Sequence, residues 1–199
     1  MTDVLSRRER KKDETRHRIF HAAIDLFREK GFEQTTVDDI TEKADVAKGT
    51  FFNYFRRKDA VLAYLTESRL LAIEENAGTF LSTDRPVTEK LIDLYTVGAS
   101  AYEEDPELAR YVLIELMSRV FEPSEESMRR WHELSMSIIR QGQERGELQR
   151  DADPERVEGV LSCIYHGTIY QWVCCVPHVF PLLPELRARL TLAMEGIAS

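Results

Sequence analysis

Two short helical segments separated by about three residues constrain this sequence more than any other feature. The spacing of apolar residues and of helix-breaking signals predicts helices at 37–44 and 48–54. Helices this short are not stable alone, so they must pack against the longer helices predicted before and after them. A long helix followed by two short ones across a tight turn is typical of a helix-turn-helix that reads DNA.

The rest of the chain also has helical periodicity. Apolar residues recur at intervals of three and four, and hairpin turns between alternating runs are almost absent. Asp-Pro-Glu at 105–107 and at 153–155 predicts two helix starts, Thr36 with Asp39 resembles a capping box, and Gly31 and Gly146 predict helix ends. We expect an all-α fold of nine helices, near 12–30, 37–44, 48–54, 58–81, 87–104, 106–121, 124–146, 154–176 and 183–198.

Charge is distributed unevenly along the chain. Residues 1–58 carry 14 Lys/Arg against 11 Asp/Glu, whereas residues 59–199 carry 13 against 24. A basic N-terminal segment followed by an acidic remainder suggests that residues 1–58 alone bind a polyanion, although a difference of this size also arises by chance. No apolar run approaches the ~20 residues of a membrane span, and no apolar stretch follows the basic start, so we expect a cytoplasmic protein.

The apolar positions of the two short helices predict which side faces inward. Ile40 and Ala44 lie on one face of the first helix with Val37, and Phe51 and Phe55 face inward from the second. The remaining side chains of the second helix are free to approach base edges, thymine methyl groups and phosphates. These are Lys48, Gly49, Thr50, Phe52, Asn53 and Tyr54.

The stretch GFEQTTVDDITEKADVAKGTFFNYFRRKDAVL, from Gly31 to Leu62, resembles the DNA-binding domain of the TetR family of bacterial transcriptional regulators. The resemblance is specific over roughly residues 12–72, and beyond them it rests on length and helix count alone. It implies two domains after a basic flexible arm: a three-helix DNA-binding domain, and a larger helical domain for ligand binding and dimerisation. The implied boundaries are 1–11 for the arm, 12–58 for the helix-turn-helix and 59–199 for the larger domain.

The resemblance also implies roles for individual residues. Phosphate contacts are implied for Thr36, Asn53, Tyr54 and Lys58, entry into the major groove for Lys48, Gly49 and Thr50, and packing on thymine methyl groups or sugar for Phe52. The role of Thr36 agrees with the attraction of a helix N-terminus for phosphate oxygens. Phe52 replaces a tyrosine often present in the family, which removes a hydroxyl contact.

Five of the six residues from Arg7 to Lys12 are basic. One interpretation is an arm that neutralises phosphates or reaches into the minor groove. The other is a solvated terminus without a defined contact. We favour DNA contact, because this segment adjoins the helix-turn-helix.

The predicted helices 154–176 and 183–198 carry apolar stripes. In the family, this pair forms a four-helix bundle with its mate, so the resemblance implies a homodimer on a palindromic operator in double-stranded DNA. The alternative is that both helices close the core of one monomer.

Residues 87–172 are rich in aromatic and methionine side chains, which suit either an ordinary core or a cavity for a small, partly apolar effector. The candidates for ligand contact are Tyr95, Tyr102, Met117, Phe121, Trp131, Met136, His166 and Tyr170. His132 and His166 are expected to be satisfied polar residues rather than metal ligands, since no Cys or carboxylate lies beside them at ligand spacing.

The three cysteines lack metal-binding or disulfide spacing, and we expect Cys163, Cys174 and Cys175 to be buried small side chains rather than a redox switch. Catalytic motifs for hydrolases, zinc proteases and nucleotide-binding enzymes are absent, the acid pairs Glu74-Glu75 and Glu103-Glu104 suit solvated helix faces, and no cofactor is expected. The prediction is a bacterial DNA-binding repressor, associated with the nucleoid when bound and released by a ligand. The alternatives are a regulator controlled by a protein partner and a helical enzyme.

Overall fold

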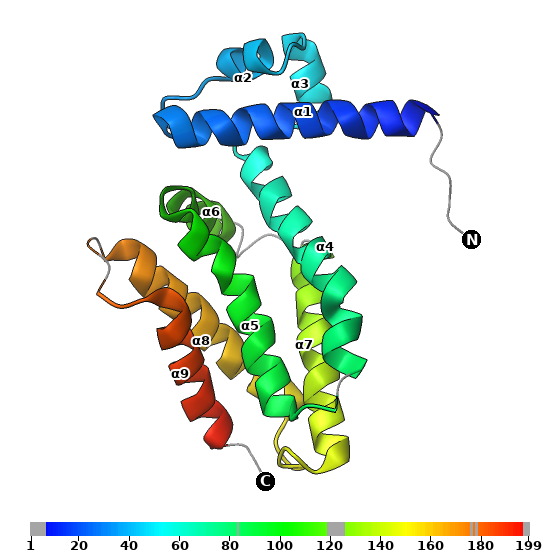
Figure 1. Cartoon of the computed structure of the whole chain (residues 1–199), viewed down its shortest axis with the longest axis vertical. Helices are drawn as coiled ribbons and strands as arrows, with labels where there is room; N and C mark the ends of the chain where they lie inside the picture. The colour runs from blue at the N-terminus through cyan, green and yellow to red at the C-terminus, as the bar shows by residue number, and fades with distance from the viewer. Residues whose placement is uncertain (1–6, 83, 119–125, 176, 178, 197–199) are drawn as a thin grey trace. The chain divides into compact units, whose positions relative to one another are not determined.

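The computed structural model describes residues 7–82, 84–118, 126–175, 177 and 179–196. All regular secondary structure in this part of the chain is helical, which confirms the all-α fold, and none of its helices is long and apolar enough to cross a membrane. The nine helices are α1 (Arg7–Lys30), α2 (Val37–Lys43), α3 (Lys48–Tyr54), α4 (Ala60–Ser82), α5 (Val87–Glu104), α6 (Pro106–Ser118), α7 (Glu126–Arg145), α8 (Pro154–Cys174) and α9 (Leu182–Glu195) (Figure 1).

The start of α1 differs from the prediction. The helix begins at Arg7, so residues 7–11, expected in a flexible arm, form its first turns. Arginine, lysine and glutamate are strong helix formers, which explains why a segment without an apolar face continues the helix. The prediction of a flexible arm was therefore wrong for residues 7–11.

The helices form two compact units, Met1–Leu65 and Thr66–Ser199, whose boundary falls within α4. In unit 1, α2 packs against both α1 and α3 (Figure 1). Its core consists of fully buried aliphatic and aromatic side chains. Among them are Ile19, Ala23, Phe27, Ile40, Phe51, Phe55, Val61 and Leu62. The predicted inward faces of α2 and α3 are thus confirmed at Ile40, Ala44, Phe51 and Phe55.

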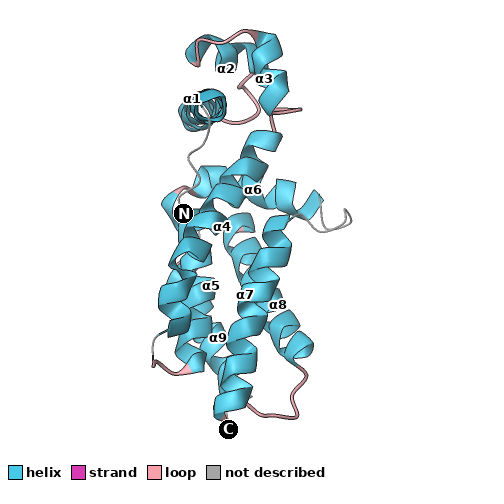
Figure 2. Ribbon diagram, turned by 90° about the vertical axis from the view of Figure 1, so that its right-hand side faces the viewer, coloured by secondary structure: helices cyan, strands magenta, loops and turns pink. Residues whose placement is uncertain are grey.

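Unit 2 is built around α5, which packs against α6, α7, α8 and α9 (Figures 1 and 2). The α8 helix also packs against α9 and α7. Side chains from four helices meet in the core, and each of them is almost completely buried. They are Leu91, Leu94 and Tyr95 of α5, Ile138 and Ile139 of α7, Leu161 and Ile169 of α8, and Leu186 and Leu190 of α9.

Two helix starts in unit 2 are capped by carboxylates from distant segments. Glu147 accepts a hydrogen bond of 2.6 Å from the backbone N–H of Val87, at the start of α5. Glu103 accepts one of 3.1 Å from the N–H of Leu182, at the start of α9. Both carboxylates satisfy helix donors that proline-led starts leave uncapped. Glu103 is half-buried, so the prediction that it belongs to a solvated face was wrong.

Candidate nucleic-acid interface

The α3 helix presents one face to solvent and the other to the core of unit 1. Phe51 is completely buried, whereas Phe52, the next residue, is 47% exposed. Lys48, Gly49 and Asn53 are exposed as well, and Thr50 and Tyr54 are half-buried. A charged amine, a glycine, an amide and an aromatic ring on an open helix face match the groups that proteins use against phosphates and base edges.

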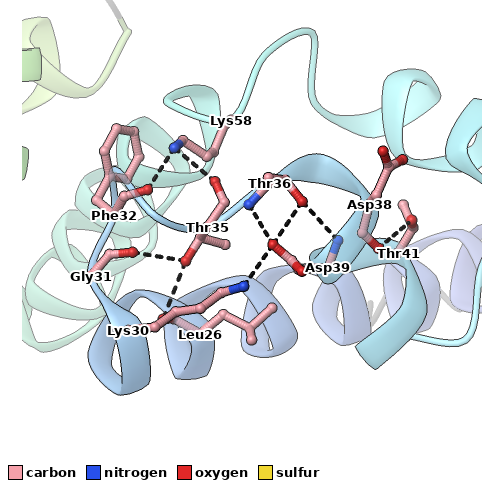
Figure 3. Close-up of polar contacts among 10 residues, drawn as sticks. All are labelled: Leu26, Lys30, Gly31, Phe32, Thr35, Thr36, Asp38, Asp39, Thr41 and Lys58. Carbon is pink, nitrogen blue, oxygen red and sulfur yellow. Dashed lines mark hydrogen bonds and ion pairs between the residues drawn. The ribbon is translucent and has the colours of Figure 1, made fainter.

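The turn before α2 is fixed by the predicted capping box (Figure 3). Asp39 Oδ2 accepts the backbone N–H of Thr36 at 2.7 Å and its hydroxyl at 2.6 Å, and the Thr36 hydroxyl in turn accepts the N–H of Asp39 at 3.1 Å. Lys30 forms an ion pair of 2.7 Å with the same oxygen. The Lys30 ammonium first, and the two Thr36 donors next, hold the pKa of Asp39 well below its ordinary value.

Thr36 was expected to bind a phosphate. In this structure its hydroxyl proton goes to Asp39, so a phosphate contact requires that hydroxyl to change its partner. The phosphate role of Thr36 remains a prediction.

Lys58 lies against the turn that follows α1 (Figure 3). Its ammonium donates to the carbonyl oxygens of Phe32, at 2.5 Å, and Thr35, at 2.8 Å, and lies 4.1 Å from the centre of the Phe32 ring. Burial lowers the pKa of Lys58. The structure therefore gives Lys58 a folding role that the sequence did not indicate. Its predicted phosphate contact remains a prediction.

Lys48, at the first position of α3, forms an ion pair of 2.7 Å with Asp38 of α2. The lysine side chain is 55% exposed and the aspartate 71% exposed. The amine is therefore held at the start of α3 by an acid that faces solvent beside it.

Unit 2 contains a polar cluster that the sequence did not reveal, which extends from the buried Tyr95, Ser135 and Glu158 to the more exposed His132 and Glu155. The buried hydroxyl of Tyr95 lies 3.0 Å from Ser135 Oγ and donates at 3.4 Å to Glu158. His132 lies between Glu158, at 3.4 Å, and Glu155, at 3.3 Å. Sequence spacing could not place these carboxylates beside His132, because it lies on α7 and they lie on α8. The described residues nevertheless contain no group of three His, Cys, Asp or Glu side chains fit to hold a metal ion.

Aromatic rings surround this cluster. Tyr95 lies edge-on to Trp131, with ring centres 5.4 Å apart, and 5.6 Å from Tyr165. Trp131 packs directly on Gly98 of α5, where an added Cβ would lie 2.7 Å from the tryptophan ring. Burial raises the pKa values of Tyr95 and Tyr165, so both keep their hydroxyl protons at neutral pH.

The structure brings some of the predicted ligand-contacting residues together. Tyr95, Tyr102, Trp131 and Met136 lie within the helix-packed interior, with Trp131 partly exposed. Phe121 and the side chain of Met117 lie outside the described residues. Tyr170 is 49% exposed and does not join the cluster, because it lies on an outer face of α8.

His166 is a satisfied polar residue, as expected. Its Nδ1 lies 2.8 Å from the carbonyl oxygen of Ser162, one turn earlier in α8. Burial lowers the pKa of His166, which favours the neutral ring.

The cysteines do not match their prediction. Cys163 and Cys174 are exposed and Cys175 is half-buried, so the interpretation as buried small side chains was wrong. The cause is their position on α8: Cys163 and Cys174 are eleven residues apart, close to three helical turns, and share the outward face with Val160 and Tyr170.

Comparison with known proteins agrees with this geometry. The profile of the family described as "Bacterial regulatory proteins, tetR family" matches residues 19–65, which contain α2 and α3. The HTH-type transcriptional repressor DhaR of Mycobacterium sp. (strain GP1) is 25% identical over 167 residues, which are 77% of this chain and 80% of DhaR.

Two solved structures extend the similarity to unit 2. The repressor FadR of Thermus thermophilus, solved with lauroyl-CoA, has a TM-score of 0.72 and 32% identity, covering 91% of this chain and 94% of FadR. FadR of Bacillus subtilis, solved with stearoyl-CoA, has a TM-score of 0.72 and 23% identity, covering 91% and 98%. The chain therefore belongs to the TetR family of DNA-binding transcriptional regulators.

Proposed function

We propose that this protein represses transcription as a homodimer bound to a palindromic operator, and that a fatty acyl-CoA thioester in unit 2 releases it. The observation that carries the DNA-binding part is the exposed face of α3, where Lys48, Gly49 and Phe52 are open to solvent. We assign the chain no enzymatic role, since its named relatives are regulators. Its place of action is the bacterial cytoplasm, at the nucleoid.

The proposed contacts of α3 with DNA combine the roles that the family resemblance implies with the exposure of Lys48, Gly49 and Phe52. Lys48, Gly49 and Thr50 enter the major groove, and Phe52 packs on thymine methyl groups or sugar. Thr36, Asn53, Tyr54 and Lys58 contact the phosphates beside it. One helix-turn-helix makes few base contacts, so a two-fold dimer that sets two α3 helices about 34–36 Å apart supplies the missing specificity.

The outer face of α8 supports the dimer. From Val160 to Cys175 the chain contains no charged residue, although Val160 is 54% exposed and Tyr170 is 49% exposed. On the neighbouring helix α9, Leu192 is 72% exposed. This part of α8 contributes no charge of its own to a chain with a net charge of −8, and such a face suits burial against a second copy.

Two considerations support a thioester as the ligand. The two FadR proteins of the same fold were solved with acyl-CoA molecules, and α5, α7 and α8 of this chain line their interior with aromatic rings. The carboxylate of Glu158 lies beside the Tyr95 hydroxyl, and it disfavours the carboxylate group of a free fatty acid more than the uncharged thioester group of an acyl-CoA. The ligand acts by preferring a conformer whose two α3 helices do not match successive major grooves.

Selection of duplexes from a random-sequence pool, followed by ligand titration, tests the DNA and ligand parts together. We expect the protein to enrich an inverted repeat, and lauroyl-CoA or stearoyl-CoA to release it, while coenzyme A and free laurate do not. If no sequence is enriched, the operator proposal fails. If the enriched duplex is retained at saturating acyl-CoA, only the ligand proposal fails.

The dimer has its own test, by sedimentation equilibrium. Leu192→Glu places a charge on the proposed interface and is expected to give monomers that bind the enriched duplex weakly. Val179→Glu is the matched control, because Val179 is 70% exposed and lies outside α8 and α9. Dimers of unchanged stability in Leu192→Glu would place the interface elsewhere.

A further inference from the structure

The lysines of the helix-turn-helix all have partners within unit 1. Between residues 30 and 58 the chain contains four lysines, and the structure places an oxygen acceptor beside each ammonium group. The pairs are Lys30 with Asp39, Lys43 with Glu29 and Lys48 with Asp38, each at 2.7 Å, and Lys58 with the carbonyl oxygens of Phe32 and Thr35. An amine of this set that binds a phosphate oxygen must therefore leave its internal oxygen or share its three donors between the two acceptors.

The pair of Lys48 and Asp38 differs from the others in its position. Lys48 begins α3, the helix that enters the groove, and Asp38 lies in the first turn of α2. Both side chains are more exposed than buried, and an exposed ion pair contributes only about 0–1 kcal/mol to stability. The pair can therefore open at little cost, and its effect falls on DNA binding rather than on folding.

The neighbouring acid, Asp39, shows the contrast. Its carboxylate accepts two donors from Thr36 and pairs with Lys30, so it caps α2 and holds the turn (Figure 3). The side chain of Asp38 has no such role: its polar contact is the ion pair with Lys48, and only its backbone carbonyl accepts the Thr41 hydroxyl. Of these two adjacent acids, Asp39 therefore stabilises the fold, whereas Asp38 contacts the lysine that begins α3.

The Asp38 carboxylate is expected to affect binding to DNA of arbitrary sequence more strongly than binding to an operator. Binding to DNA of arbitrary sequence rests almost wholly on phosphate charge, whereas an operator adds contacts to base edges. A carboxylate beside Lys48 neutralises its charge and repels phosphates. The carboxylate therefore weakens binding most for arbitrary sequences, because their affinity comes almost entirely from the attraction between the protein and phosphate charge. On an operator, base contacts of α3 offset the opening of the pair, and Asp38 has already fixed where the amine lies.

We propose that Asp38 is a specificity-determining residue, which holds the Lys48 ammonium at the start of α3 and suppresses binding to non-operator DNA. The juxtaposition of a solvent-facing acid with the first residue of the recognition helix carries this inference. It rests on the proposed reading of DNA by α3, and it is independent of the effector and of the effector's site in unit 2.

The experiment compares Asp38→Asn with the wild type on two probes of about 30 base pairs. One is a random-sequence pool, and the other is the duplex that the wild type enriches from that pool. At about 0.1 M salt we expect Asp38→Asn to bind the random pool about three- to tenfold more tightly and the enriched duplex less than about twofold more tightly. The plot of log affinity against log salt for the random pool should steepen by up to about one unit.

Two further variants make the result decisive. Asp45→Asn removes an equal charge from the turn between α2 and α3, where Asp45 has a φ of +51° that asparagine tolerates, and no ion pair is described for it. We expect little change in either affinity. In the double variant Asp38→Asn with Lys48→Met, the gain on random DNA should disappear, because the gain acts through the freed amine.

Three results would overturn the proposal. An equal gain on both probes would mean that Asp38 does not discriminate between them. An equal gain in Asp45→Asn would reduce the effect to net charge, and a gain that persists without Lys48 would exclude the ion pair as its cause. A thermal unfolding midpoint of Asp38→Asn within about five degrees of the wild type, which is the most that loss of an exposed ion pair should cost, confirms that changed folding does not cause the gain.

Discussion

The two units of this protein differ in how their polar contacts are built. In unit 1 the important contacts at the start of α2 join residues three apart, as in the hydrogen bonds between Thr36 and Asp39. In unit 2 the corresponding contacts join residues far apart: 60 positions separate Val87 from Glu147, and 79 separate Glu103 from Leu182. Local contacts shape the turn before α2 in unit 1, whereas contacts between distant helices make unit 2 a packed body whose helices depend on one another.

The largest expected effect tests the division of α3 into an inner and an outer face. Phe51→Ala removes a fully buried ring from unit 1, and such a change costs about 3–5 kcal/mol. We expect loss of DNA binding and a lowered first unfolding transition in calorimetry, with the transition of unit 2 retained.

Phe52→Ala is the matched control, since it removes the same side chain from the next position, where the ring is 47% exposed. It should leave unfolding nearly unchanged and weaken binding to the enriched duplex. Equal destabilisation by both changes would mean that α3 has no distinct outer face.

Lys58 tests a non-local contact of unit 1, since its partners lie 23 and 26 residues earlier in the chain. In Lys58→Met the carbonyl oxygens of Phe32 and Thr35 lose a charged donor, and we expect unit 1 to lose about 1–2 kcal/mol in urea unfolding without DNA. Arg57→Met, at the exposed neighbouring residue, serves as the control. A variant as stable as the wild type would limit Lys58 to a DNA contact.

Glu103 tests the long-range capping of unit 2. Glu103→Ala leaves the N–H of Leu182 without its carboxylate acceptor, and we expect a loss of about 1 kcal/mol. Glu104→Ala changes the exposed residue beside it and should be close to neutral. The measurement is urea unfolding followed by the fluorescence of the two tryptophans, Trp131 and Trp172, both of which lie in unit 2. Equal losses in the two variants would argue against capping.

The smallest effect is expected in the pH dependence of unit 1. Because the folded pKa of Asp39 is depressed, its contribution to stability is complete above the ordinary aspartate pKa of about 4 and is lost as the pH falls toward the folded pKa. Unfolding midpoints measured between about pH 6 and pH 3 should therefore fall less in Asp39→Asn than in the wild type. Parallel curves would remove Asp39 from the acid response.

Sequence predicted the features that depend on neighbours along the chain. The capping box, the ends of α1 and α7 at Gly31 and Gly146, and the Asp153 cap of α8 all appear in the structure, with positive φ at both glycines. Each rests on local backbone chemistry, which a few residues suffice to specify.

Sequence could not predict contacts that depend on how helices pack. Glu158 is buried beside Tyr95 because α5 and α8 pack together in unit 2. The spacing of these two residues in the sequence does not predict this contact. The exposure of Cys163 and Cys174 also depends on how helices pack. An uncharged helix has the same sequence pattern whether its outer face contacts the core or a second copy. The outward position of Lys48 was predicted from the apolar face of α3, and its entry into the groove from the resemblance, whereas its acidic partner emerged only with the fold.

Footprinting of the enriched duplex at single-nucleotide resolution tests the central claim most directly. The account predicts two protected half-sites in inverted orientation, centred about 10 base pairs apart or at a multiple of that distance, and loss of the paired pattern in Leu192→Glu. A single protected half-site, or two in the same orientation, would contradict a two-fold dimer that reads DNA with α3.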